Sequence, residues 1–256
     1  MKNIFQTNNY VCASYKKIMK RTLVITLIFG LFHTSFGQSQ EIVPGDSIPW
    51  EIRKQSFIFS TANRFNDPIV ARMALYNLLS ENPLNAALYD SLAVSYLQSN
   101  QNASAALVAR QALQLNPQDQ FAMEIAAVGF DNLGAKDLAL ANYEKLHLAN
   151  GEINTLYKIS FLQLELKRYA ESNTSLDIII GDPQSEEVLI AFPTVDGAGQ
   201  DVKLKTAAHR IKAMILEDQG DTEGAKAKYL EVLEMEPGFQ IVQQQLRALT
   251  NPKEGN

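Results

Sequence analysis

Residues 86–119 read AALYDSLAVSYLQSNQNASAALVARQALQLNPQD, and this stretch decides the fold. Alanines and bulky apolar residues recur at three- and four-residue spacing, first around Tyr96 and again around Ala105. That spacing is typical of amphipathic helices. Asn100 stands between the two patterns and Pro117 follows the second, where a turn and a stop are expected. The stretch therefore predicts two antiparallel helices joined by a short turn.

The same pattern recurs with a period of 34 residues. Three separate series of small or turn-forming residues share this period. They are Pro83, Pro117 and Gly151; Asn66, Asn100 and Gly134; and Ala71, Ala105 and Ala139. A fixed period of this length indicates one supersecondary unit copied along the chain. We therefore expect about five copies.

This period, with small residues at fixed offsets and Pro or Gly ending each copy, resembles the tetratricopeptide repeat. The resemblance covers most of the chain beyond residue 37 and is clearest in 86–119 and 120–152. It implies an all-α fold, a right-handed α-solenoid of about five helix-turn-helix repeats. Within 52–239 we place the copies at 52–85, 86–119, 120–152, 153–185 and 206–239.

Stacking of the copies explains the residue types. A single helical hairpin cannot bury its apolar face, so neighbouring copies must pack together. Alanines are expected where helices approach closely, and aromatic residues where neighbouring copies leave space. The alanines are Ala93, Ala105, Ala127 and Ala139, and the aromatics are Tyr96, Phe130, Tyr143 and Tyr229.

An insertion at 186–205 separates the fourth and fifth copies. Its apolar run 188–192 and a later alternating stretch flank a glycine-containing turn, which predicts a β-hairpin. Pro193 should weaken the first strand. Two roles are open for the hairpin: it packs Leu189 and Phe192 onto the helices, or its exposed strand edge binds a partner.

The N-terminus resembles an export signal. Basic residues precede the apolar run 23–32, and small residues then lead to Gly37, so residues 1–37 are predicted to be a signal peptide. The alternative is a retained membrane anchor, but a membrane span needs about 20 apolar residues and the run 23–32 is shorter. Translation from Met19 would shorten the signal. We expect a periplasmic or secreted protein with no stable membrane span after cleavage. Residues 38–51 are a predicted linker, and 240–256 a predicted capping helix and tail.

Composition excludes several classes of protein. The 256 residues are 46% apolar, with one cysteine and a net charge of -5. Without residues 1–37, 18 basic residues face 28 acidic ones, a net charge of -10. Such an acidic body argues against nucleic-acid binding, which needs a surplus of Lys and Arg. A single cysteine excludes a disulfide scaffold.

The sequence offers no constellation for catalysis. His147 and His209 fall in different repeats without a second ligand nearby, whereas a metal site needs three or four ligands. No Gly-x-Ser-x-Gly motif is present, and Gly197–Gly199 lacks the length and following helix of a phosphate loop. We therefore predict no catalytic residues, no cofactor and no metal, and a protein that is not an enzyme.

The resemblance implies that the first helix of each repeat lines a concave groove for peptides or helices. An apolar strip edged by acids would suit a partner with apolar anchors and basic flanks. The alternative is that the apolar members pack against their own neighbouring helices. The groove positions are Asp90, Val94, Leu97, Phe121, Glu124, Val128, Asp131, Tyr157, Phe161, Leu164, Arg210 and Met214, with Glu165 and Glu217 beside them.

These features favour a non-enzymatic periplasmic protein that mediates protein–protein interaction. The leading hypothesis is a scaffold or adaptor for an envelope protein. The alternative is a holdase-like binder of unfolded or secreted polypeptides. Repeat architecture supports binding in general and does not separate the two. The oligomeric state stays open.

Overall fold

The computed structural model describes residues 48–195, 197 and 199–250. The predicted signal peptide, most of the predicted linker and the last residues of the predicted tail lie outside the described residues. Among the described helices, none combines the length and apolarity that crossing a bilayer requires.

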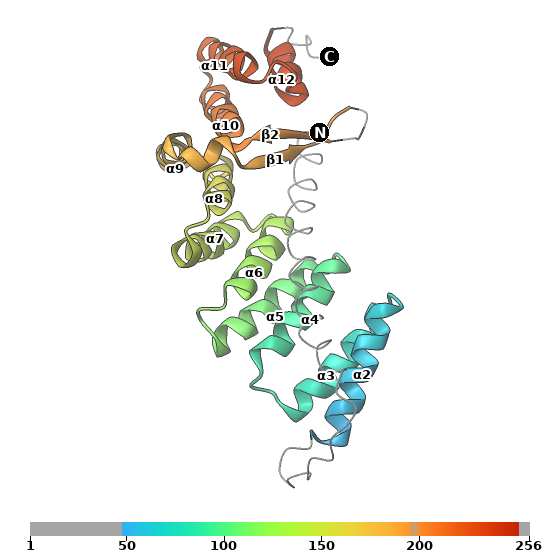
Figure 1. The fold of residues 1–256 in the computed structure, drawn as a ribbon. Helices are drawn as coiled ribbons and strands as arrows, with labels where there is room; N and C mark the ends of the chain where they lie inside the picture. Colours follow the sequence, from blue (N-terminus) through green and yellow to red (C-terminus); the bar gives the residue numbers. More distant parts are fainter. Residues whose placement is uncertain (1–47, 196, 198, 251–256) are drawn as a thin grey trace, which may run out of the picture. The chain divides into compact units, whose positions relative to one another are not determined.

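The described chain is all-α apart from one small hairpin, as predicted (Figure 1). Consecutive helices pack as pairs, α2 with α3, α4 with α5, α8 with α9 and α10 with α11. The helices are α2 (Trp50–Arg64), α3 (Pro68–Glu81), α4 (Ala86–Gln98), α5 (Asn102–Leu115), α6 (Gln120–Asn132), α7 (Lys136–Asn150), α8 (Ile153–Glu165), α9 (Tyr169–Gly181), α10 (Leu204–Asp218), α11 (Thr222–Met235) and α12 (Gln240–Thr250), with a 3-10 turn at Pro183–Glu186.

The helices belong to two compact units. The N-terminal unit includes residues 48–125, and its core joins Leu75, Leu78 and Leu79 of α3 to Leu92 of α4. The C-terminal unit includes residues 126–250 and the hairpin.

The turns that the spacing predicted within the helix pairs adopt the left-handed backbone conformation. Asn66, Asn100 and Gly134 have φ of 55°, 56° and 74°. Lys167 and Gly220 occupy the equivalent turns of the later pairs, with φ of 59° and 85°. Asparagine and glycine tolerate this conformation best. The period of 34 therefore reflects one recurring backbone requirement.

Packing follows the predicted division between small and bulky residues. Ala93, Ala105, Ala127 and Ala139 are all fully buried. Tyr143, Tyr229 and Phe130 are buried too, whereas Tyr96 is half-buried and its hydroxyl lies 2.7 Å from that of Tyr76. The alanine side chain is a single methyl group, so paired helices can approach closely at these positions, while the larger aromatic rings fill the space between helices.

The insertion forms the predicted antiparallel hairpin of β1 (Leu189–Phe192) and β2 (Gln200–Lys203). Strand β1 ends immediately before Pro193, which cannot donate a ladder hydrogen bond. Phe192 is buried, as one interpretation expected, but Leu189 is 57% exposed, so its predicted packing is wrong. The two residues are three apart, and alternate residues of a strand face opposite sides, so both cannot face the helices.

Candidate functional site

The predicted groove positions differ sharply in burial. Six of them lie in the core of their units: Val94, Leu97, Val128, Tyr157, Leu164 and Arg210. Six others are half-buried and keep surface for contact: Asp90, Phe121, Glu124, Asp131, Phe161 and Met214. Only the second set therefore presents side-chain surface in the described conformation.

Two half-buried positions come from neighbouring first helices of the C-terminal unit. Phe161 lies on α8 and Met214 on α10, and these two helices pack against each other. We call Phe161 and Met214 the α8–α10 strip. A phenyl ring and a flexible thioether are adaptable apolar contacts for a bound polypeptide.

The acids predicted at the groove edge are joined by a lysine. Nζ of Lys136 lies 2.6 Å from Oδ1 of Asp131 and 3.0 Å from Oε2 of Glu165. Burial opposes the charge of Lys136, but the two carboxylates outweigh it and raise the pKa of Lys136. Burial also raises the pKa of Glu165, and Lys136 opposes that shift. The edge formed by these three residues therefore carries a single net negative charge.

Asp90, on α4, forms an acid pair with Asp119 in the N-terminal unit. Asp119 accepts backbone hydrogen bonds from Phe121 at 3.0 Å and Ala122 at 3.1 Å, so its carboxylate caps α6. Burial raises the pKa of Asp90 from 3.8 to about 7, and the charge of Asp119 and the hydrogen bond to it add to the shift. The folded protein thus retains a proton on Asp90 at pH values where the unfolded chain has lost it.

Asp90→Asn is expected to stabilise the protein at about pH 8 and to change little at about pH 4. The carboxyl ionises near 3.8 when unfolded and near 7 when folded, so wild-type stability falls as pH rises between these values. Asparagine cannot ionise, and screening at this half-buried site limits the gain to about 1–2 kcal/mol. Urea unfolding across this pH range measures the difference. Asp201→Asn, at an exposed aspartate of β2, is the control, and a gain equal at both pH values would contradict the assignment.

Arg210, on α10, is fully buried beneath the hairpin. Its Nε donates a hydrogen bond of 2.8 Å to Oε1 of Gln245 on α12, and its guanidinium lies 5.5 Å from the ring centroid of Phe192. Nη1 and Nη2 have no hydrogen-bond partner among the described residues. The hydrogen bond to Gln245 and the packing against Phe192 hold this side chain, and its burial keeps it from contacting a partner in this conformation.

The histidines among the described residues, His147 and His209, have separate partners. Nδ1 of His147 lies 3.1 Å from the carbonyl oxygen of Glu152, and Nδ1 of His209 lies 3.2 Å from Oε1 of Glu231. Burial lowers the pKa of His209, and Lys228 adds to this while Glu231 opposes it. Within the described ranges, no three His, Cys, Asp or Glu side chains are grouped as a metal site would require.

Comparison with known proteins gives a match in fold alone. Neither a protein-family model nor a curated protein sequence matches this chain. A tetratricopeptide repeat protein from Parabacteroides merdae ATCC 43184 aligns with a TM-score of 0.61 at 18% identity, over 78% of this chain and 73% of that chain. MamA 41-end from Desulfovibrio magneticus RS-1 aligns with a TM-score of 0.57 at 13% identity, over 75% of this chain and 99% of that one. The chain has a tetratricopeptide-repeat fold.

The helix pair α2–α3, the first among the described residues, exposes large apolar side chains, whereas the ends of repeat arrays normally present a polar outer face. Five large apolar residues here are 61% to 75% exposed: Trp50, Phe57, Phe65, Ile69 and Met73. Trp50 and Phe57 are two helical turns apart, so they share one side of α2. The predicted groove contained none of these residues. The signal available in the sequence was the seven-residue spacing of Trp50 and Phe57, which places both on one side of a helix.

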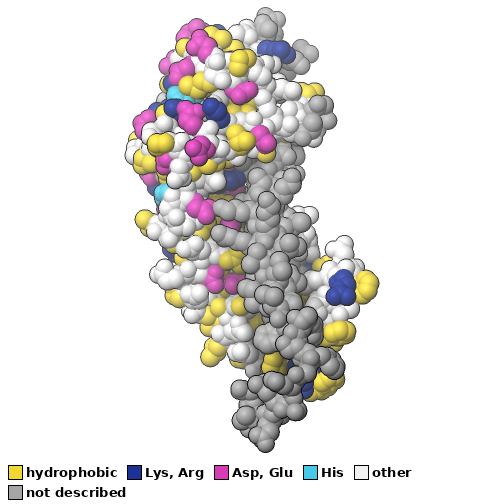
Figure 2. Space-filling view, in the orientation of Figure 1, with side chains coloured by type: hydrophobic (Ala, Val, Ile, Leu, Met, Phe, Trp, Pro, Cys, Tyr) yellow, Lys and Arg dark blue, Asp and Glu magenta, His cyan; other side chains and the backbone are white. Residues whose placement is uncertain are grey.

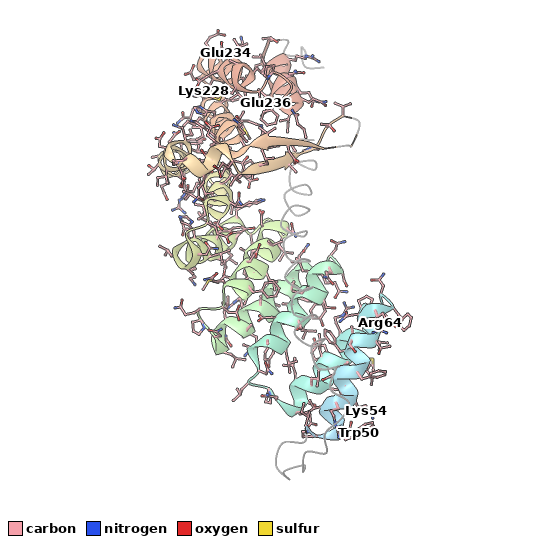
Figure 3. The ribbon with its side chains drawn as sticks, viewed as in Figure 1. Trp50, Lys54, Arg64, Lys228, Glu234 and Glu236 are labelled. Carbon is pink, nitrogen blue, oxygen red and sulfur yellow. The ribbon has the colours of Figure 1, made fainter. Side chains whose placement is uncertain are left out.

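Basic residues occupy the same side of α2. Arg53, Lys54 and Arg64 follow Trp50 and Phe57 at three-, four- and seven-residue offsets and are all exposed. Figure 3 shows Trp50 and Lys54 towards one end of α2 and Arg64 at the other. We call these five residues the α2 face. The guanidinium of Arg53 lies 6.0 Å from the ring centroid of Trp50, and Lys54 forms an exposed ion pair of 3.6 Å with Glu51.

Proposed function

We propose that this protein is a non-catalytic binding module that is exported and holds a polypeptide partner in the cell envelope. The observation that carries the proposal is the α8–α10 strip: Phe161 and Met214 remain partly exposed on adjacent first helices of a tetratricopeptide fold. This is the side on which the resemblance places ligands. The basic, apolar N-terminal sequence supports export.

The charge around the strip favours a partner with basic flanks. Glu217 is exposed near the end of α10, and its Oε2 accepts a hydrogen bond of 2.8 Å from the hydroxyl of Tyr229. That bond fixes the position of the Glu217 carboxylate. The cluster of Asp131, Lys136 and Glu165 adds a net negative charge. Apolar anchors would supply affinity, and lysine or arginine beside them would supply orientation and a faster association rate.

In-cell photo-crosslinking from position 161 tests this proposal. A crosslinking amino acid in place of Phe161 should capture one dominant envelope protein, and a second probe at Met214 should capture the same protein. The control probe replaces Leu148, which is 87% exposed on α7 and lies outside the predicted groove. Products identical to those of the control, or none from a folded and exported protein, would refute binding at the strip. Crosslinks to many unrelated exported proteins would support a holdase instead of a scaffold.

A further inference from the structure

The α2 face is both aromatic and basic, so a surface that binds it must be complementary to both properties. Trp50 and Phe57 expose apolar area, while Arg53, Lys54 and Arg64 give the same side three positive charges. Ile69 and Met73, one turn apart on α3, expose further apolar area. Exposed apolar surface of this kind marks an interaction site. Its occupant must offer apolar contacts and negative charge together.

The chain itself carries a surface of that chemistry on α11. Residues 217–236 hold seven acids and two lysines, a net charge of -5. Figure 2 shows acidic side chains gathered over α9, α10 and α11. One exposed side of α11 runs through four residues at helical spacing, which we call the α11 face: Glu223, Ala227, Leu230 and Glu234. Leu230 is 52% exposed, and Glu234 has no ion pair among the described residues.

We propose that the α2 face of one molecule docks on the α11 face of a second copy. The two faces are complementary in charge, and both expose apolar side chains. On α2, Arg53, Lys54 and Arg64 flank Phe57, while Trp50 begins the helix. On α11, Glu223 and Glu234 flank Ala227 and Leu230. Both helices are similar in length, at 15 and 14 residues, so they can pack along their full lengths.

Charge excludes the simplest alternative, two α2 faces meeting across a twofold axis. That arrangement would bring Arg53, Lys54 and Arg64 of both copies together, and like charges at an interface are unfavourable. A contact between two different faces is heterologous, so each bound copy leaves one face of each kind unused. The association therefore extends to chains or rings whose size grows with protein concentration.

The association is expected to be weak. One helix face per partner buries less than the roughly 800 Å² per partner of a stable complex. Its charges lie at the surface, so salt screens them. Sedimentation of the protein purified after export should show the weight-average mass rising about twofold between roughly 5 and 300 µM at low salt. The rise should disappear at about 1 M salt.

Charge reversal tests which faces meet. Arg53→Glu with Lys54→Glu should abolish the rise in mass, and so should Glu223→Lys with Glu234→Lys. All four changes in one chain should restore it, because the reversed faces again complement each other. Lys145→Glu, at an exposed lysine of α7, is the control and should leave association unchanged. The α2 reversal puts acids near the N-terminal end of its helix, where they favour folding.

Trp50 reports occupancy of the α2 face directly, because it is the only tryptophan of the chain. Its emission should shift to the blue, and its quenching by acrylamide should fall, as the mass rises. Constant mass with constant Trp50 emission would overturn the proposal. Blue emission at every concentration with constant mass would also overturn it, because the chain would then cover its own α2 face. A rise in mass that survives the α11 reversal would place the α2 face against a different surface.

Discussion

Tyr229→Ala is expected to destabilise the C-terminal unit by about 3–5 kcal/mol, the usual cost of removing a large buried aromatic side chain. Tyr229 lies on α11, is fully buried, and donates its hydroxyl hydrogen to Glu217 at 2.8 Å. Burial, with the Glu217 carboxylate second, raises the pKa of Tyr229, so the hydroxyl stays protonated at any physiological pH. The loss combines an unfilled cavity with a broken hydrogen bond.

Because the chain has two compact units, separate probes can show which unit loses stability in Tyr229→Ala. Circular dichroism should show helix content falling at lower urea in Tyr229→Ala than in wild type, while the emission of Trp50, in the N-terminal unit, should change less. Tyr229→Phe keeps the packing and removes the hydroxyl, so it should cost about 0.5–1.5 kcal/mol. Equal losses for the alanine and phenylalanine variants would contradict a role for the ring in packing.

Arg210→Met is expected to stabilise the protein by about 1–3 kcal/mol, although it removes the hydrogen bond to Gln245. Methionine has a similar length and fills the space over Phe192. It also removes a buried charge whose Nη1 and Nη2 atoms have no protein partner among the described residues. Replacing a buried charge by an apolar group of similar volume is often neutral or favourable.

Urea unfolding of Arg210→Met at neutral pH measures the gain, with Arg247→Met as the matched control. Arg247 is exposed on α12, so its replacement should change the free energy of unfolding by less than about 0.5 kcal/mol. A loss of stability in Arg210→Met larger than about 2 kcal/mol would mean that the guanidinium gains its missing hydrogen bonds in solution.

The fold could be predicted because its constraints are local and repeated. A left-handed turn is needed once per helix pair, and Asn66, Asn100 and Gly134 satisfy it at equal spacing. Lys167 adopts the same left-handed conformation, but lysine is an unusual residue there, so the sequence did not indicate that turn. The hairpin was predicted from its alternation, but the packing of Leu189 was not, because the prediction joined two residues of opposite faces.

The site was harder to predict because burial depends on neighbours distant in sequence. Arg210 was expected on an open groove, yet it lies under Phe192 from the hairpin and beside Gln245 from α12. Two glutamines of α12 likewise have distant partners: the side chains of Gln240 and Gln245 both accept hydrogen bonds, from Val195 and Arg210. No local pattern distinguishes a solvent-facing glutamine from one that meets a partner tens of residues away.

The hairpin changes how the end of the array opens. In a solenoid without insertions, each repeat contacts only its neighbours in sequence, so the last helix is expected to unfold first. Here the rings of Phe192 and Phe239 meet at 4.8 Å, and Gln200 bonds the carbonyl of Gly238 at 2.9 Å and the backbone N–H of Gln240 at 3.2 Å. The hairpin, which precedes α10 in sequence, thus contacts and stabilises the start of α12. Helices α10 to α12 should therefore open as one cooperative unit, so the amides of α12 should be protected from hydrogen exchange as well as those of α10.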